Sequence, residues 1–284
     1  MTATANAAIY NQGVVYVIYD EAGANAVTDK TDKNSNGVPD VIEDIATQIN
    51  AAREVFIAFN YPDPLNCERF KNVASIEVYI EAAETLKLNG MASATVRKKS
   101  VHNPDERALQ LKIANVTNPR TNSTPTHEYF HLVQYSATYF RNAWFLEGMA
   151  RWSQDAADKI NYPSALDLNF KLKSNFAEKK IFRGKYDMAE FLWYPLAVSK
   201  KDKAKISAAL IKKYKYVDGS PVFHDNIFCG AHVMLKVLNA LKTKEELAAA
   251  QFGGIETWRK SGQRADSNNK IILDCVKGVC YDKF

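Results

Sequence analysis

His127, Glu128 and His131 form an H-E-x-x-H pattern in the middle of the chain. Residues four apart on a helix lie on one face, one turn apart, so the two imidazoles can bind one metal ion. Zinc accepts such nitrogen ligands at about 2.0–2.1 Å. Glu128 projects beside the same face, where it can take a proton from a water at the metal. The pattern therefore predicts a zinc site that activates water.

A catalytic zinc site needs a third protein ligand and one open position. The third histidine of metzincins would fall six residues after His131, where this chain has Ala137. Glu147 is the remaining candidate, because a carboxylate in an apolar stretch needs a partner if it is buried. The apolar neighbours of Glu147 are Trp144, Phe145, Leu146, Met149 and Trp152.

The H-E-x-x-H pattern followed by Trp144-Phe145-Leu146-Glu147-Gly148-Met149-Ala150 resembles the gluzincin branch of zinc peptidases, which includes thermolysin-like and aminopeptidase-like enzymes. The resemblance covers about 30 of the 284 residues. It implies zinc ligation by His127, His131 and Glu147, with Glu128 as the general base. Two features depart from thermolysin-like enzymes. The interval between His131 and Glu147 is shorter, and Arg151 stands where those enzymes have an aspartate that supports a zinc-bound histidine.

Attack of water on a carbonyl also needs a group that stabilises the oxyanion. Gluzincins commonly use a tyrosine or histidine of the C-terminal lobe, and the resemblance implies the same here. Tyr186 is the first candidate, followed by Tyr194 and His232. The chain has 14 tyrosines, so a packing role is the alternative for each of them.

A calcium-type pattern lies nearer the N-terminus, between Asp32 and Glu43. It has the spacing of an EF-hand loop, with oxygen ligands at positions 1, 3, 5, 9 and 12, glycine at position 6 and a backbone carbonyl at position 7. These positions are Asp32, Asn34, Asn36, Asp40 and Glu43, then Gly37, then Val38. The stretch resembles the single D-x-N-x-N-G-x-P-D loops of secreted bacterial proteins. It predicts a structural calcium ion at the start of a helix, and the alternative is a polar turn that binds nothing.

Four cysteines give a further indication of the compartment. Cys275 and Cys280 flank a short segment that a local disulfide could close, which leaves Cys67 and Cys229 as a second pair. An even count suits an oxidising compartment, and four reduced thiols are the alternative. Together with the calcium-type loop, this pattern predicts a secreted, periplasmic or cell-surface protein.

The composition excludes several other classes. No run of 18 apolar residues is present, so no membrane span is expected. The net charge of +5 is spread over small clusters, which argues against a nucleic-acid-binding face. The start, Met1 to Asn6, lacks the features of a signal peptide, so either the protein is cytosolic or a leader has been removed from a secreted form.

Hydrophobic periodicity predicts the elements that position these residues. Strands are expected within 8–19 (with a turn at 11–13), 74–81 and 108–116, helices at 40–59, 125–139, 143–159, 164–180, 187–199, 202–215, 225–241 and 243–251, and a loop at 86–105. The last 20 residues read as irregular, with a short strand at 271–273. Strands that precede helices indicate an α+β fold. We expect a zincin-like arrangement, with an N-terminal lobe (1–140) that ends in the H-E-x-x-H helix and a mainly helical lobe (141–284) that carries the third ligand.

These features predict a secreted zinc endopeptidase that binds a peptide substrate between the lobes. No G-x-M-x-N-like motif for an amino terminus is present, which favours an endopeptidase over an aminopeptidase. The segment from Leu109 to Val116 is expected to be an edge strand near the cleft, where it could pair with an extended peptide. Two alternatives stay open: a non-catalytic zincin-fold binding module and a zinc hydrolase of a non-peptide substrate.

Overall fold

The computed structural model describes residues 7–158, 160, 162 and 168–281. The N-terminal half forms a five-stranded mixed sheet with the strand order β1-β2-β3-β5-β4. The strands are β1 (Ala7–Gln12), β2 (Val15–Asp20), β3 (Val73–Glu81), β4 (Gly90–Arg97) and β5 (Arg107–Ala114). The three inner strands β2, β3 and β5 are parallel, and the edge strands β1 and β4 run antiparallel to their neighbours.

The first two strands form a hairpin, as the apolar run and its turn residues predicted. Gly13 adopts a positive φ of 64° at the turn, a conformation that glycine reaches without strain. The Asn11 side chain closes the turn by donating to the carbonyls of Gly13 and Val15. The predicted strands at 74–81 and 108–116 are also present, as β3 and β5.

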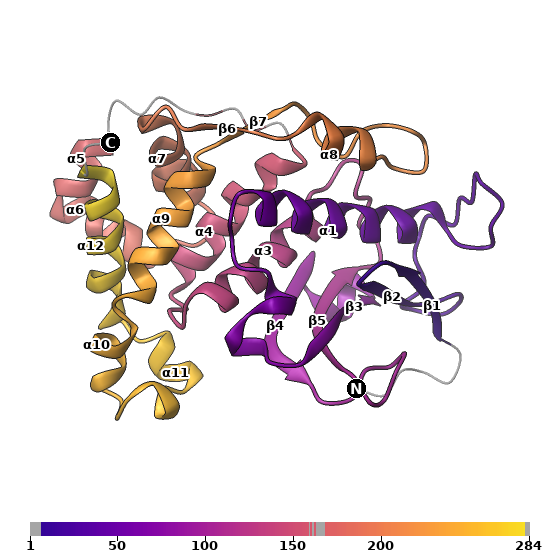
Figure 1. Ribbon diagram of the computed structural model, residues 1–284, viewed down its shortest axis with the longest axis horizontal. Coiled ribbons are helices and arrows are strands. Elements are labelled where there is room, and N and C mark those ends of the chain that lie inside the picture. Colours follow the sequence, from indigo (N-terminus) through magenta and orange to yellow (C-terminus); the bar gives the residue numbers. More distant parts are fainter. Residues whose placement is uncertain (1–6, 159, 161, 163–167, 282–284) are drawn as a thin grey trace.

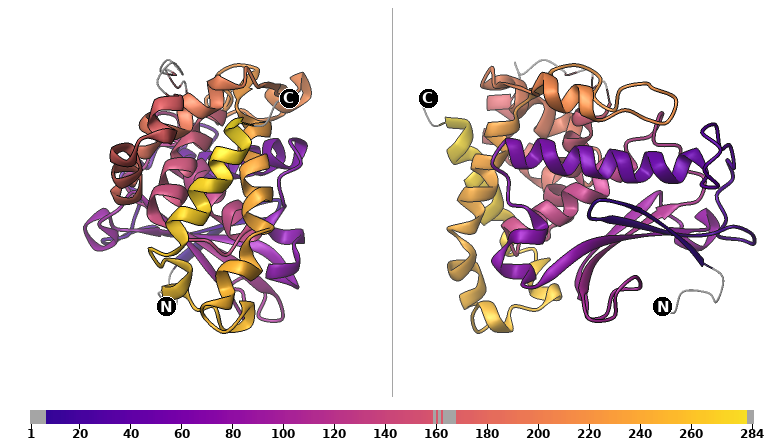
Figure 2. Two further views of the ribbon diagram at one scale, coloured as in Figure 1. Left: turned by 90° about the vertical axis from the view of Figure 1, so that its left-hand side faces the viewer. Right: turned by 45° about the vertical axis from the view of Figure 1, so that its right-hand side comes forward.

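Two helices, α1 (Asp40–Ala58) and α3 (Thr124–Ala137), lie side by side on one face of this sheet (Figure 1; Figure 2, right). The predicted apolar stripe of α1 is buried, and it consists of Val41, Ile45, Ile49, Ala52 and Phe56. Because α1 and α3 pack on the sheet and on each other, the H-E-x-x-H helix is held between the sheet and the rest of the molecule. The side chains of α3 therefore have little freedom to move.

The C-terminal half is mainly helical and packs beyond α3, at one end of the sheet (Figure 1). Its helices are α4 (Ala143–Ser153), α5 (Leu168–Lys173), α6 (Asn175–Arg183), α7 (Tyr194–Ser199), α8 (Ala208–Lys213), α9 (Ala231–Lys242), α10 (Glu245–Ala250), α11 (Lys260–Gln263) and α12 (Asn268–Tyr281). A π-helical turn (Ala189–Trp193) precedes α7, and a small hairpin consists of β6 (Lys203–Lys205) and β7 (Ile227–Cys229). The fold is α+β, as predicted. Residues 164–167 of the helix predicted at 164–180 lie outside the described residues, and the rest forms α5 and α6.

Within the described part of the chain, no helix has both the length and the apolar character needed to cross a membrane. One buried core runs through both halves of the described chain. Phe56 of α1 contacts Phe130 of α3, and Phe130 in turn contacts Trp152 of α4. These aromatic contacts fix the position of α3 relative to α4.

Several local predictions were wrong. The helices predicted at 202–215 and 225–241 each contain a strand, β6 and β7 respectively, ahead of the shorter helices α8 and α9. A short helix, α2 (Ala83–Leu86), leads into the expected loop at 86–105, and the loop itself contains β4, whose small residues give no apolar alternation. The last residues form α12 instead of a strand, because Ile272, Val276 and Val279 recur at helical spacing and are buried. The segment from Leu109 to Val116 does not form an edge strand, since β5 lies between β3 and β4.

The disulfide predictions were also wrong, because all four cysteines are free. Cys275 and Cys280 lie on α12, and the segment between them is helix rather than a chain reversal. Residues five apart on a helix project about 140° away from each other. The Cys67 thiol contacts the carbonyl of Pro64. The cysteines therefore give no support for an oxidising compartment.

Candidate metal centre

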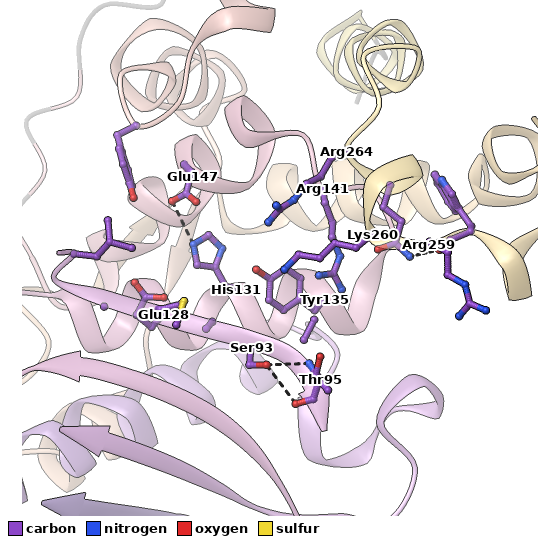
Figure 3. Close-up of a pocket in the computed structure, with 18 residues that line it drawn as sticks. Ser93, Thr95, Glu128, His131, Tyr135, Arg141, Glu147, Arg259, Lys260 and Arg264 are labelled. Carbon is purple, nitrogen blue, oxygen red and sulfur yellow. Dashed lines mark hydrogen bonds and ion pairs between the residues drawn. The ribbon is translucent and has the colours of Figure 1, made fainter. Parts of the chain in front are cut away.

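His127 and His131 lie on α3, and Glu147 lies on the adjacent helix α4. The Nε2 atoms of both histidines are 3.4 Å from the same carboxylate oxygen, Oε2 of Glu147. The three ligand atoms lie within 4.8 Å of one another. Figure 3 shows His131 and Glu147 facing each other above Glu128. The structure thus brings together the three residues that the sequence predicted as ligands.

The start of α3 is held by side-chain hydrogen bonds. Thr124 is the first helical residue, and its N–H and hydroxyl both donate to Asn122 Oδ1. Two residues later, the N–H of Thr126 donates to Gln48 of α1. These bonds satisfy N–H groups that a helix start leaves without a partner. They also fix the position of His127, the first candidate ligand on α3.

Gln134 sets the tautomer of His131. Its Oε1 lies 2.8 Å from Nδ1 of His131, while its Nε2 donates to the carbonyl of Leu146 at 3.1 Å. Since the amide nitrogen is already donating, the amide oxygen must accept, and Nδ1 of His131 carries the proton. In the neutral imidazole, Nε2 is then the nitrogen without a proton, and it faces Glu147; in the imidazolium, Nε2 carries a proton that it donates to Glu147. A partner on the remote nitrogen is the usual way in which proteins orient a metal-binding histidine.

This support was not predicted from the sequence, in which Arg151 replaces the aspartate that supports a zinc-bound histidine in thermolysin-like enzymes. Arg151 instead points to Glu190, with 3.8 Å between Nη2 and Oε1, at the surface. His127 has a glutamine neighbour of its own, Gln154, whose amide also donates to Ser123. The one signal for Gln134 was its place three residues after His131, on the same face of the helix.

The pKa values of the three groups reflect this clustering. Burial lowers the pKa of His127, against the opposing hydrogen bond with Glu147. Burial also works to lower the pKa of His131. The hydrogen bond with Glu147 and the charge of Glu128 outweigh burial, so the pKa of His131 is raised overall. Burial disfavours the Glu147 carboxylate, yet the hydrogen bonds with the two histidines hold its pKa far below the usual range. Glu147 is thus an anion at neutral pH, as a metal ligand must be.

Glu128 is buried beneath the edge strand β4, with 5 % of its surface exposed. Burial raises the pKa of Glu128 to about 7, against a hydrogen bond from the backbone of Ala92 that favours the anion. A carboxyl group with such a pKa can exchange a proton with water near neutral pH. Gly90 makes the close approach of β4 possible, because a Cβ there would lie 2.6 Å from Cγ of Glu128.

Tyr186 is the one candidate for oxyanion stabilisation that lies at this site. Its ring centroid is 5.9 Å from that of His127, and its phenol forms a hydrogen bond with Glu147. Burial and the charges of Glu147 and Glu128 raise the pKa of Tyr186 to about 12, so the phenol keeps its proton. Tyr194 lies elsewhere, against the carbonyl of Arg151, and the ring of His232 pairs with Asp202.

The site opens into a cleft of about 450 Å³. One wall consists of β4 residues from Gly90 to Thr95, and the opposite wall includes residues from Trp258 to Arg264. Glu128, His131, Glu147 and Tyr186 line the cleft between these walls. A substrate in the cleft would therefore contact β4 together with His131 and Glu147.

The predicted calcium loop has the expected turn, with Gly37 at a φ of 84°. Both carboxylate oxygens of Glu43 accept from side-chain amides, one from Asn34 and one from Asn36. The carboxylate of Asp32 accepts from the N–H groups of Asn36 and Gly37. These side chains thus surround one loop.

Asp40, the predicted ligand at position 9, faces other partners. Its carboxylate accepts from the N–H of Lys33 and pairs with Arg120 at 3.3 Å. Among the described residues, the carboxylates of Asp32, Asp40 and Glu43 therefore do not form a cluster that could hold a metal ion. The ligand atoms of His127, His131 and Glu147 do form such a cluster.

The donor set at the first site fits zinc on chemical grounds. Two imidazoles and one carboxylate are a ligand set of catalytic zinc, and the carboxylate supplies negative charge to a cation in a buried place. The orientation of His131 by Gln134 leaves a nitrogen lone pair toward the centre of the group. Comparison of the chain with protein families, with curated proteins and with solved structures finds no match.

Proposed function

We propose that this protein is a zinc-dependent peptidase of the gluzincin type. One observation carries the proposal: two Nε2 atoms of the H-E-x-x-H helix meet the same Glu147 oxygen, each at 3.4 Å, with Glu128 buried in the same cleft. The sheet followed by a helical half, with the ligands at their junction, supports a zincin-like fold. His127, His131 and Glu147 would hold the zinc ion.

Zinc, when bound, supplies a Lewis acid that polarises a carbonyl and makes water a better nucleophile. Glu128 takes the proton of the attacking water and later delivers it to the leaving amine. Tyr186 donates its phenolic hydrogen to the oxygen that becomes negative during the attack. Gln134 holds His131 in the tautomer that presents Nε2.

A peptide substrate is favoured by the position of β4. This strand is the outer strand of the sheet, and it lines the cleft from Gly90 to Thr95. An extended peptide can add to such an edge through backbone hydrogen bonds. The sequence suggested this substrate-binding role for the strand from Leu109 to Val116. Because β4 is the edge strand at the cleft, we assign the role to β4 instead.

Removal of the metal tests the proposal. We expect one zinc ion per chain, hydrolysis of unstructured protein substrates such as casein, loss of that activity with a chelator, and recovery when zinc is returned. A chain that binds zinc but cleaves neither peptides nor esters would be the non-catalytic binding module. Cleavage of esters without cleavage of peptides would indicate a hydrolase of another substrate class.

Substitution of Gly90 by alanine should reduce turnover although residue 90 carries no reactive group. The new Cβ would lie 2.6 Å from Cγ and 2.8 Å from Oε1 of Glu128, and the carboxyl group would have to shift. A misplacement of about 1 Å costs roughly 10²-fold in rate. We expect a loss of kcat of that order with normal zinc content. Gly278→Ala, with open space around the new methyl group, is the matched control and should keep wild-type activity.

Substitution of Tyr186 by phenylalanine should lower kcat by roughly 10²–10³-fold and leave KM nearly unchanged, because loss of one oxyanion donor acts on the transition state. The fold should tolerate the change, since Tyr186 is 43 % exposed. Steady-state kinetics on one peptide measure the effect. Tyr194→Phe is the control, and an equal loss in both variants would contradict the role of Tyr186.

We further propose that the loop from Asp32 to Glu43 binds a structural calcium ion, through the oxygens that its internal hydrogen bonds already gather. The extracellular location expected from the sequence rests on this loop. For an affinity typical of extracellular modules, 10 mM calcium should stabilise the fold by about 1–3 kcal/mol. Thermal unfolding with and without calcium measures this, and Glu43→Gln should remove the gain. An exposed control, Glu21→Gln, should retain it; no gain in the wild type would refute the site.

A further inference from the structure

Four basic side chains line the cleft on the wall opposite β4: Arg141, Arg259, Lys260 and Arg264. Arg141 follows α3, Lys260 begins α11, and Arg259 and Arg264 flank that short helix. Figure 3 shows them on one side of the cleft, with Tyr135 between them and His131. Segments far apart in the sequence therefore bring positive charge to one wall.

No carboxylate neutralises this wall. None of the four side chains forms an ion pair with an acidic residue of the described chain. The charge of Arg264 lowers the pKa of Lys260, and burial followed by Arg264 lowers that of Arg141. Like charges thus lie close enough to oppose one another, an arrangement that costs stability without an anion.

Arg141 is the most unusual member of the group. It is 8 % exposed, and its Nε has no hydrogen-bond partner. A buried guanidinium N–H without an acceptor is costly, and proteins seldom retain one without a reason. Its guanidinium carbon lies 4.5 Å from the ring centroid of Tyr135, and its backbone N–H donates to Gln263 on α11. The residue is therefore both fixed in place and lacking an anion.

The negative charges of the cleft are engaged elsewhere. Glu147 faces His127 and His131, and Glu128 lies under β4. Asp266 lines an adjoining cavity, where it accepts from the side chain of Asn269. The cleft therefore has an acidic end at the candidate metal centre and a basic end without counter-charges.

We propose that this wall, Arg141, Lys260 and Arg264 with Arg259 at its rim, binds a carboxylate of the substrate close to the scissile bond. This inference rests on the proposed peptidase function and adds a substrate preference to it. An arginine and a carboxylate form strong, charge-assisted hydrogen bonds, and the unpaired Nε of Arg141 would gain an acceptor.

The spacing restricts where that carboxylate lies along a peptide. The ring centroids of His131 and Tyr135 are 6.0 Å apart, and the guanidinium of Arg141 follows 4.5 Å beyond Tyr135. An extended chain advances about 3.3 Å per residue, so these two steps span at most about three residues. The carboxylate belongs either to an aspartate or glutamate at that distance or to the C-terminus of a short peptide.

Two pairs of quenched fluorescent peptides separate these sources. The first pair differs by glutamate or glutamine, placed in turn at each of the three positions on either side of the cleaved bond. The second pair has a free or an amidated C-terminus at the same distances. We expect kcat/KM to be about tenfold higher for the charged member of one pair, in line with one charge-assisted hydrogen bond. Equal rates within every pair would overturn the inference.

Charge reversal at the exposed residues then assigns the preference to this wall. In Lys260→Glu and Arg264→Glu we expect the preference for the charged peptide to disappear, and a lysine-containing peptide to be favoured instead. Lys212→Glu on α8, exposed and outside the cleft, should behave as the wild type. A preference that persists in both reversals would place the carboxylate elsewhere and refute the proposal.

A binding measurement tests the basic wall independently of the proposed catalytic activity. Fluorescence anisotropy of the same peptides with the Glu128→Gln variant reports affinity without turnover. Tighter binding of the charged peptides that depends on Lys260 and Arg264 supports the basic wall even if no peptide is cleaved, whereas equal binding contradicts it. Absence of cleavage in the zinc-loaded wild type refutes the peptidase function alone.

Discussion

Glu128→Gln should abolish nearly all turnover while the zinc ion stays bound. Glutamine has the size of glutamate and keeps the contacts under β4, but it cannot take a proton from water. A positioned base contributes roughly 10²–10⁴-fold to such reactions, and we expect a loss of about 10³-fold or more in kcat. Peptide hydrolysis at matched zinc content measures this, with metal content determined on the same sample.

The stability of the metal-free variant is an internal control. Burial raises the pKa of Glu128, so the folded state disfavours the carboxylate at any pH above the pKa of the unfolded chain. A neutral amide removes that penalty, and the melting temperature at pH 7 should not fall. Loss of activity together with a lower melting temperature would mean damage to the fold. Full activity would show that another group is the base.

The grouping of His127, His131 and Glu147 was predictable because it rests on local rules. The interval between His127 and His131 is one helical turn, and helix geometry alone places both imidazoles on one face. Glu147 was indicated by its setting, since a carboxylate among large apolar residues needs a buried partner. In the structure Glu147 lies across from both histidines. The strands before the helices were likewise visible as a change of period along the chain.

Other parts of the site depend on tertiary packing and left little trace in the sequence. The strand β4 has small and polar residues, so no alternation marked it, yet it covers Glu128 through the close approach at Gly90. Arg141 and Arg264 are separated by more than a hundred positions, and tertiary contacts such as the hydrogen bonds from Arg141 to Gln263 and from Asn142 to Ala265 bring their segments together. Charge clustering of this kind cannot be derived from the spacing of residues along the chain.

Glu147→Ala should remove the zinc ion rather than only slow the reaction. The substitution deletes the single anionic ligand and leaves two buried imidazoles facing each other. Loss of a residue that merely supports a ligand typically costs 10–100-fold in metal affinity, so loss of the ligand itself should exceed about 100-fold. Calorimetric titration with zinc, and zinc content after dialysis, measure the affinity directly.

In the metal-free protein, the contact between Glu147 and the two histidines should also contribute to thermal stability. Hydrogen bonds with His127 and His131 hold the pKa of Glu147 below its usual value. Such a carboxylate stabilises the fold above the pKa of the unfolded chain, and the stabilisation is lost as the pH falls toward the folded pKa. Glu147→Ala should therefore lower the melting temperature at pH 7, and the difference from wild type should shrink in acid.

Glu190→Ala provides the matched control for this substitution. Glu190 lies on the π-helical turn that packs against α4, and its side chain is 70 % exposed. It touches none of the three ligands, so zinc affinity and melting temperature should match the wild type. If Glu147→Ala also retained one zinc ion with unchanged affinity, the carboxylate would not be a ligand. The two histidines would then require a different third partner, and the gluzincin proposal would fail with it.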